Sequence, residues 1–191
     1  MNIREWMFRA LLFEAEAEHF RKAGIRLGAD IKELEYKLIE EVLSPFSILL
    51  RNEALQMTRL YALVYCFENS LREVIRDRLE EKYKANWWTG HVPEKIQTKA
   101  ATRREDAQKN SWLEGDKKDL LSFTEFGDLA AIIIENWDDF SDLIPSQHWL
   151  KQRMDEMEQA RNFIAHNRLL LPTEFERIEM YVRDWNKMVG L

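Results

Sequence analysis

A short polar cluster interrupts an apolar helical pattern near the C-terminal end of the chain. Residues 161–166 read Arg-Asn-Phe-Ile-Ala-His and so bring together a guanidinium, an amide and an imidazole. Arg161 offers a planar, permanent charge that matches phosphate oxygens, and His166 can accept or donate a proton near neutral pH. Asn162 can orient a hydroxyl or a phosphate oxygen without adding charge. These groups suit metal-free RNA cleavage, in which a ribose 2′-hydroxyl attacks the adjacent phosphorus.

Helical geometry decides whether these side chains can share a ligand. At about 100° per residue, Asn162 and His166 lie about 40° apart around the axis, whereas Arg161 and His166 lie about 140° apart. Arg161 and His166 can therefore share a ligand only if the helix loosens at His166 or the long arginine side chain bends round. On spacing alone, a surface arginine followed by a histidine that caps the last carbonyls is the more ordinary interpretation.

Apolar residues at three- and four-residue intervals predict the elements that carry this cluster. We expect one long helix over residues 46–84 and a short, buried helix over residues 125–137. The next helix should begin at Pro145-Ser146, carry the cluster and end near Asn167. A final helix should begin with a capping box at Thr173–Glu176.

Two stretches fall outside this regular pattern. Residues 85–118 are polar and basic, with Lys95, Lys99 and Arg103 among them, and we expect a long loop or insertion there. It could follow an RNA backbone or be a plain solvated loop. Residues 1–45 predict an α-hairpin arm, with one helix over residues 2–23 and a second that begins at Asp30 and ends before Ser44-Pro45.

The composition favours an all-α protein. Six Gly and four Pro in 191 residues are too few for the many tight turns of an all-β fold, and 46% hydrophobic with 32% charged residues is a globular composition. The formal net charge of −6 argues against a dedicated duplex-DNA binder but allows a local basic groove.

Cysteine and histidine usage gives no sign of a metal or a cofactor. Cys66 is the single cysteine and stands in an apolar stretch, so we expect it to be buried in a chain of the reducing cytoplasm. His19, His91 and His148 have no partners at metal-ligand spacing. No segment reaches the roughly 18 apolar residues of a membrane span, and the N-terminus lacks the apolar centre of a signal peptide.

Residues 161–166 resemble the Arg-x4-6-His motif of the HEPN superfamily, which stands on the third main helix before a short turn and a final helix. Residues 65–75, which include Glu68, are similar to the first main helix of the HEPN branch that contains Swt-type RNA-processing proteins and bacterial defence proteins. Residues 123–129 and the pair Trp87-Trp88 also resemble that branch. The resemblance covers residues 46–191 and implies a HEPN-like bundle of about four main helices, with the arm, residues 1–45, outside it.

The resemblance implies a function as well as a fold. HEPN ribonucleases are homodimers that cut single-stranded RNA without a metal, at a composite cleft where two copies of the motif meet. Arg161 would then bind the scissile phosphate, His166 would act as general acid or base, and Asn162 would position either the substrate or His166. Arg168 and Asn167 would contribute to substrate binding. Glu68 would hold Arg161 in place, or else pair with Arg72 four residues on.

The resemblance also leaves alternatives open. Toxins of this superfamily that are paired with a nucleotidyltransferase antitoxin commonly carry a tyrosine two residues after the histidine, and Arg168 stands at that position here. Control by modification of such a tyrosine is therefore not expected. A toxin or antiviral role, with some antitoxin or regulatory protein, is still expected. The alternative is a non-catalytic HEPN module that dimerises and binds RNA, a nucleotide or a protein. A plain helical interaction protein is a third reading.

Overall fold

The computed structural model describes residue 22, residues 36–109 and residues 119–190 of the chain. The chain forms two compact units, Met1–Leu55 and Gln56–Leu191. In the first unit, a π-helical segment, Leu38–Val42, ends just before Ser44-Pro45, as that dipeptide predicts. The helices expected over residues 2–23 and from Asp30 lie outside the described residues.

The long helix expected over residues 46–84 is confirmed as α3, Ile48–Tyr83. Beyond residue 55, one of its faces is buried at three- and four-residue steps, because a stripe at this spacing stays on one side of a helix. The buried side chains of that stripe are Leu60, Val64, Phe67, Leu71, Ile75 and Leu79. This stripe forms one wall of the core of the second unit.

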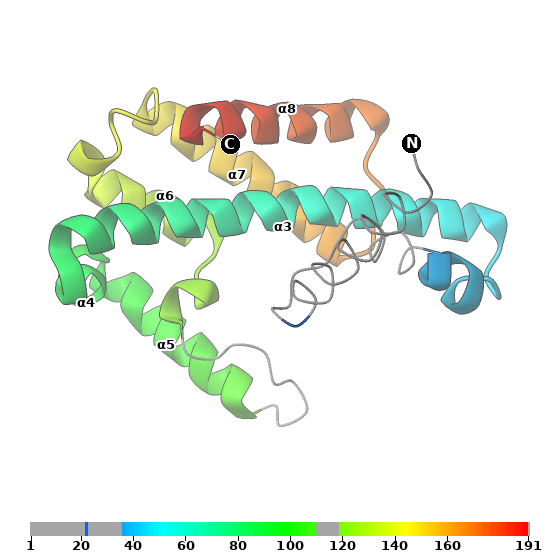
Figure 1. Cartoon of the computed structure of the whole chain (residues 1–191), viewed down its shortest axis with the longest axis horizontal. Coiled ribbons are helices and arrows are strands. Elements are labelled where there is room, and N and C mark those ends of the chain that lie inside the picture. The colour runs from blue at the N-terminus through cyan, green and yellow to red at the C-terminus, as the bar shows by residue number, and fades with distance from the viewer. Residues whose placement is uncertain (1–21, 23–35, 110–118, 191) are drawn as a thin grey trace, which may run out of the picture. The chain divides into compact units, whose positions relative to one another are not determined.

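Three more helices complete the main bundle, so the predicted all-α fold is confirmed. They are α6 (Phe126–Glu135), α7 (Gln147–Ala165) and α8 (Pro172–Val189). Figure 1 shows α8 running alongside α3, whereas α7 passes obliquely behind it. Aromatic rings join them, since Phe67 contacts Phe126 and Trp185 at centroid distances of 5.9 and 5.7 Å. The buried Trp185 indole N–H donates to Ser70 Oγ at 2.9 Å, which ties α8 to α3.

Of the long loop or insertion expected over residues 85–118, the loop is wrong for most of this length because the segment is helical. The short helix α4 (Trp87–His91) leads into α5 (Glu94–Lys109), a regular helix of 16 residues. Only Ile96 and Ala100 of α5 are buried, so the apolar repeat that reveals a helix in a sequence is too sparse here. A 3₁₀ turn, η3 (Leu120–Phe123), precedes α6. Residues 110–118 lie outside the described part.

Side chains at the helix starts explain where α7 and α8 begin. Ser146 Oγ accepts the Trp149 N–H at 3.1 Å, which confirms the predicted start of α7. The capping box predicted at Thr173–Glu176 is wrong. The helix begins earlier, with Pro172 in its first turn, and Glu174 reaches back to the Leu171 N–H at 2.7 Å.

Two further observations concern the surface. Cys66 is exposed, so its predicted burial is wrong. It lies between the exposed Tyr65 and the buried Phe67 on α3 and is not part of the buried stripe of that helix. Among the described helices, none combines the length and the apolar character that a membrane crossing requires.

Candidate functional site

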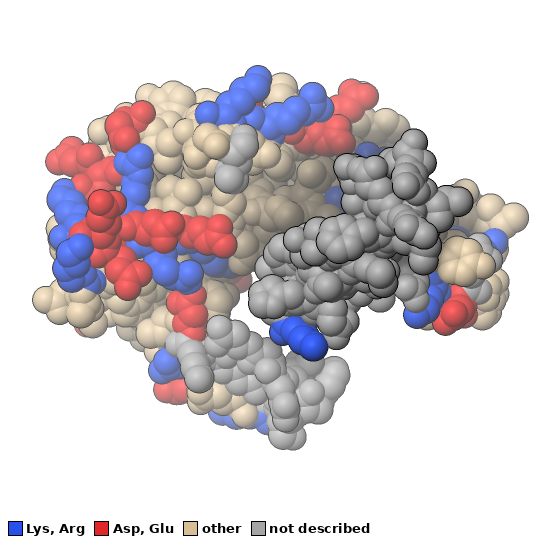
Figure 2. Space-filling model, in the orientation of Figure 1, with Lys and Arg blue, Asp and Glu red and all other residues tan. Residues whose placement is uncertain are grey.

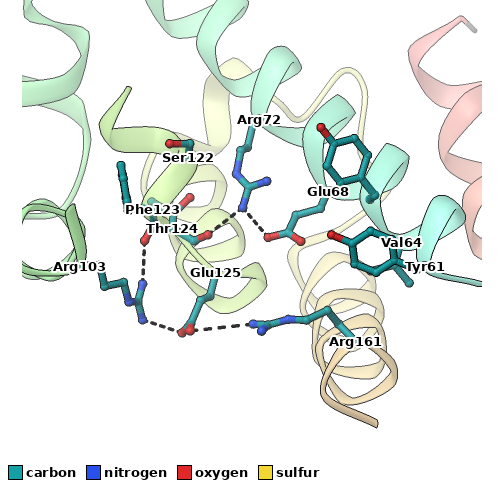
Figure 3. Close-up of a pocket in the computed structure, with 11 residues that line it drawn as sticks. Tyr61, Val64, Glu68, Arg72, Arg103, Ser122, Phe123, Thr124, Glu125 and Arg161 are labelled. Carbon is teal, nitrogen blue, oxygen red and sulfur yellow. Dashed lines mark hydrogen bonds and ion pairs between the residues drawn. The ribbon is translucent and has the colours of Figure 1, made fainter. Parts of the chain in front are cut away.

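A cavity of about 300 Å³ lies between α3, α5, the η3–α6 connection and α7 (Figure 3). Its lining combines aromatic rings, three guanidinium groups and two carboxylates. The lining residues are Tyr61, Val64, Tyr65, Glu68, Arg72, Arg103, Ser122, Phe123, Thr124, Glu125 and Arg161. Such a mixture suits a polar ligand that has both a charge and a flat apolar surface.

Arg72 of α3 builds the wall of this cavity rather than offering a binding group. Its Nε donates to the Leu121 carbonyl at 3.2 Å, and its Nη2 donates to the Thr124 carbonyl at 2.9 Å. The same guanidinium pairs with Glu68 and donates to Asn69 Oδ1 at 3.2 Å. Because its donors are occupied, Arg72 fixes the η3 turn against α3.

Arg103 of α5 grips the same connection from the other side. It donates to the Phe123 carbonyl at 3.0 Å, to Asp128 Oδ2 at 2.9 Å and to Glu125 Oε2 at 2.6 Å. Burial alone would raise the pKa of Asp128, but hydrogen bonds from Arg103, the Glu125 backbone N–H and Lys99 hold that pKa below its ordinary value. Lys99 and Arg103, two of the basic residues expected either to follow an RNA backbone or to belong to a plain solvated loop, are both ion-paired within the fold.

Arg161 of α7 is the guanidinium of this cavity with donors to spare. Its Nη2 lies 3.9 Å from Glu125 Oε1, too far for a hydrogen bond. Its Nε is buried and has no hydrogen-bond partner among the described residues. Figure 3 shows Glu125 between Arg103 and Arg161, with a dashed line to each. Arg161 is thus held near one carboxylate by charge, with hydrogen-bonding capacity left for an anion.

The loosened helix end that the sequence geometry required is present after Ala165. Asn167 takes a positive φ of 55°, and its N–H donates to the Ile164 carbonyl at 2.8 Å. The Arg168 N–H donates to the Phe163 carbonyl at 3.2 Å. This pair of bonds is a Schellman motif, and Asn is one of the few residues that accept its left-handed position. The predicted end of α7 near Asn167 is therefore confirmed.

The same turn places two predicted site residues. The backbone of His166, at φ −93° and ψ 16°, is no longer α-helical. Its N–H still donates to the Asn162 carbonyl at 3.2 Å. The Arg168 guanidinium lies 5.5 Å from the centre of the Phe163 ring. In a Schellman motif, the residues at these two positions are commonly in apolar contact, and here a guanidinium lies against an aromatic ring instead.

The predicted site residues therefore fall into two groups. Arg161 and Glu68 line the cavity, although Glu68 pairs with Arg72 while the carboxylate nearest Arg161 is Glu125. The other four are exposed and lie outside the cavity lining: Asn162, His166, Asn167 and Arg168. His166 is thus not among the described residues that line the cavity around Arg161.

Sequence reasoning missed several residues that the cavity brings together. Glu125 had one local signal, its place immediately before the apolar helix α6, where an acidic residue is favoured. Nothing local connects Glu125 with Arg103 or Arg161, because the pairing depends on how α5, α6 and α7 pack. Tyr61 and Tyr65 have no local signal beyond being aromatic residues with a polar end on α3.

The surface and the remaining histidines complete the picture. On the face shown in Figure 2, basic and acidic side chains of the second unit are interspersed rather than gathered in one basic area.

The remaining described histidines do not form a site. His91 stacks on Tyr83, and its Nδ1 lies 3.2 Å from Asn136 Oδ1, so its contacts are structural. His148 is exposed. Within the described residues, no group of three or more His, Cys, Asp or Glu could hold a metal ion. His19 lies outside them.

Comparison with known proteins gives one result that bears on this site. A family model described as Swt1-like HEPN matches residues 63–190, which is more than half of the chain. The match includes α6, α7 and α8, most of α3, and nearly all of the cavity lining. No curated protein and no solved structure matches the chain.

The left-handed position at the end of α7 leads to a stability prediction. Asn167→Val should lower the free energy of unfolding by about 1–2 kcal/mol, because a β-branched residue is strained at positive φ. Asn167→Gly should match or slightly exceed the wild type. Urea unfolding of the three proteins measures both effects. Equal loss in the Val and Gly variants would contradict this account and point to the asparagine side chain itself.

The ion-paired Asp128 leads to a prediction about pH. Since its pKa is lowered in the folded state, its contribution to stability is present above the ordinary carboxyl pKa and is lost as the pH falls through the folded value. Asp128→Asn should therefore cost about 1.5–3 kcal/mol at pH 7, and the difference from wild type should shrink towards pH 3. Urea unfolding at both pH values tests this. Asp77→Asn, on the exposed face of α3, is the control and should show no such difference.

Proposed function

We propose that this chain, which belongs to the Swt1-like HEPN family, is an endoribonuclease that cleaves single-stranded RNA without a metal. The observation that carries the proposal is the state of Arg161. Its Nε is buried without a partner and its nearest carboxylate lies 3.9 Å away. A charged donor held in this way, at the edge of a cavity, is suited to a phosphate group.

Arg161 would stabilise the charge that develops on the phosphodiester. When the 2′-hydroxyl attacks phosphorus, negative charge grows on the non-bridging oxygens of the phosphorane. The planar fork can donate two parallel hydrogen bonds to those oxygens, and the low local dielectric strengthens them. Glu125 and the end of α7 keep the fork near the cavity edge while this happens.

His166 would move the protons of the same reaction. As general base it takes the proton from the 2′-hydroxyl, and as general acid it gives a proton to the departing 5′-oxygen. Its exposed position at the end of α7 leaves the ring accessible to a strand. Asn162, one helical turn earlier on nearly the same face, can orient either His166 or the ribose.

A second copy of the chain would complete the site. Because His166 does not line the cavity that Arg161 lines, we propose that two motifs meet across a homodimer and form one composite cleft. The exposed Asn167 and Arg168 would then contact the RNA backbone, and Arg168 adds positive charge there. The charge is local, which is compatible with a chain of net charge −6. A role in a toxin or antiviral system, under a regulatory partner, belongs to this proposal.

One observation favours a second candidate, a non-catalytic HEPN module that binds RNA or a protein. Within one chain, His166 does not line the cavity that Arg161 lines. A module that only binds its partner does not need the two residues to act on the same ligand. RNA binding that is unaffected by His166→Ala, with no cleavage by the wild type, would support that candidate.

Cleavage of single-stranded RNA in the presence of EDTA tests the proposed chemistry. His166→Ala should reduce the rate by roughly 10²–10⁴-fold, since it removes the general acid–base group. Arg161→Ala should reduce it by at least roughly 10²-fold, since it removes charge stabilisation. His148→Ala, an exposed histidine in the first turn of the same helix, should retain the wild-type rate. Inactivity of the wild type, or equal activity of His166→Ala, counts against the proposal.

Mixing two inactive variants tests the composite cleft. In a 1:1 mixture of Arg161→Ala and His166→Ala, half of the exchanged dimers are mixed. The cleft of a dimer contains two Arg161–His166 pairs, and one pair of each mixed dimer is intact if a pair draws its residues from different chains. Activity should then recover to about a quarter of the wild-type value. No recovery after complete exchange would place both residues of each site on one chain.

A further inference from the structure

Two tyrosines stand side by side on the wall of the Arg161 cavity. Tyr61 and Tyr65 are one helical turn apart on α3, and their ring centroids lie 6.1 Å apart at an interplanar angle of 35°. Both line the cavity, yet their exposed fractions are 58% and 55%. More than half of the surface of each residue is therefore open to solvent, beside an arginine with free donors.

The fold itself does not account for these rings. Neighbouring positions of the same helix, Leu60 and Val64, are almost fully buried and supply the packing there. Neither tyrosine hydroxyl forms a hydrogen bond within the described part of the chain, so no described residue anchors either ring by its polar end. A single exposed aromatic residue is ordinary, but two adjacent rings beside a charged cavity form a surface that a flat ligand can cover.

We propose that Tyr61 and Tyr65 form a base-stacking subsite for a single-stranded RNA whose phosphate lies at Arg161. This inference rests on the proposed function for the identity of the ligand. A nucleotide carries both groups that the cavity complements: a π-face for the tyrosines and an anion for the guanidinium. Stacking needs an unpaired base, so the subsite selects single strands over duplexes.

The dimensions and charges of the cavity agree with this ligand. A cavity of about 300 Å³ is at the lower end of small-molecule sites, which suits one base or one nucleotide. The competing occupant is an apolar surface of a second protein chain. The centres of such interfaces are depleted of charged residues, whereas Glu68, Arg72 and Arg161 stand in this cavity beside the two rings.

The experiment measures binding apart from cleavage. The probe is a fluorescent single-stranded RNA with 2′-O-methyl groups, which cannot be cleaved by 2′-hydroxyl attack, and the readout is anisotropy with the full chain. Tyr61→Ala and Tyr65→Ala should each weaken binding roughly 5- to 150-fold, and Tyr65→Trp should retain wild-type affinity. Tyr36→Ala, which removes another exposed tyrosine at 65%, should leave affinity unchanged. Unaltered thermal unfolding of each variant excludes misfolding as the cause.

A second arm assigns the effect to the base. Replacing one nucleotide of the probe by an abasic unit should weaken binding to wild type, and the same replacement should weaken binding less with the double variant Tyr61→Ala/Tyr65→Ala.

Unchanged affinity in both alanine variants overturns the subsite. So does a result in which the variants lose only dimer formation, as measured by sedimentation. If cleavage occurs with unaltered KM in these variants, the ribonuclease proposal stands and the subsite fails. If the tyrosines govern binding but no cleavage occurs, the reverse holds.

Discussion

The cavity depends on how two arginines hold one short turn. Arg72 and Arg103 come from helices on opposite sides of the η3–α6 connection and together bond three of its carbonyls, those of Leu121, Phe123 and Thr124. Backbone carbonyls in an irregular segment need partners when they are shielded from water, and charged donors satisfy them well. With the turn fixed in this way, Glu125 lies where it can pair with Arg103 and still attract Arg161. Two of three guanidinium groups thus maintain the structure, and this leaves the third available.

The sequence predicted the elements whose burial repeats regularly. For α3, α6, α7 and α8, apolar residues mark the buried face, and local side chains such as Ser146 mark an end. It failed for α5, because a helix that buries only Ile96 and Ala100 and otherwise forms ion pairs resembles a polar loop. It also placed the capping box of α8 two residues too late, because Pro172 and Glu174 provide a competing start.

The candidate site was predictable only in its local part. The cluster on α7 could be recognised from residue types, spacing and resemblance, and the position of Asn167 follows from its tolerance of left-handed geometry. The environment of Arg161 could not be predicted in the same way. Glu125 is 36 residues away in the sequence, and its carboxylate reaches the guanidinium only through the packing of three helices. For the same reason, the pairing of Glu68 with Arg72 instead of Arg161 was one of two open alternatives.

The end of α7 has a consequence for how such a motif can vary. Inside a helix, adding one residue between an arginine and a histidine would rotate the imidazole by about 100° and carry it to another face. Here the helical rotation stops at Ala165, and the reversal of the chain at Asn167 sets the course of the backbone around His166. An extra or missing residue in such a reversal changes the shape of the turn, but it does not rotate the following residues around a helix axis. A spacing of four to six residues, as in the motif that this segment resembles, is then compatible with one common arrangement of the two side chains.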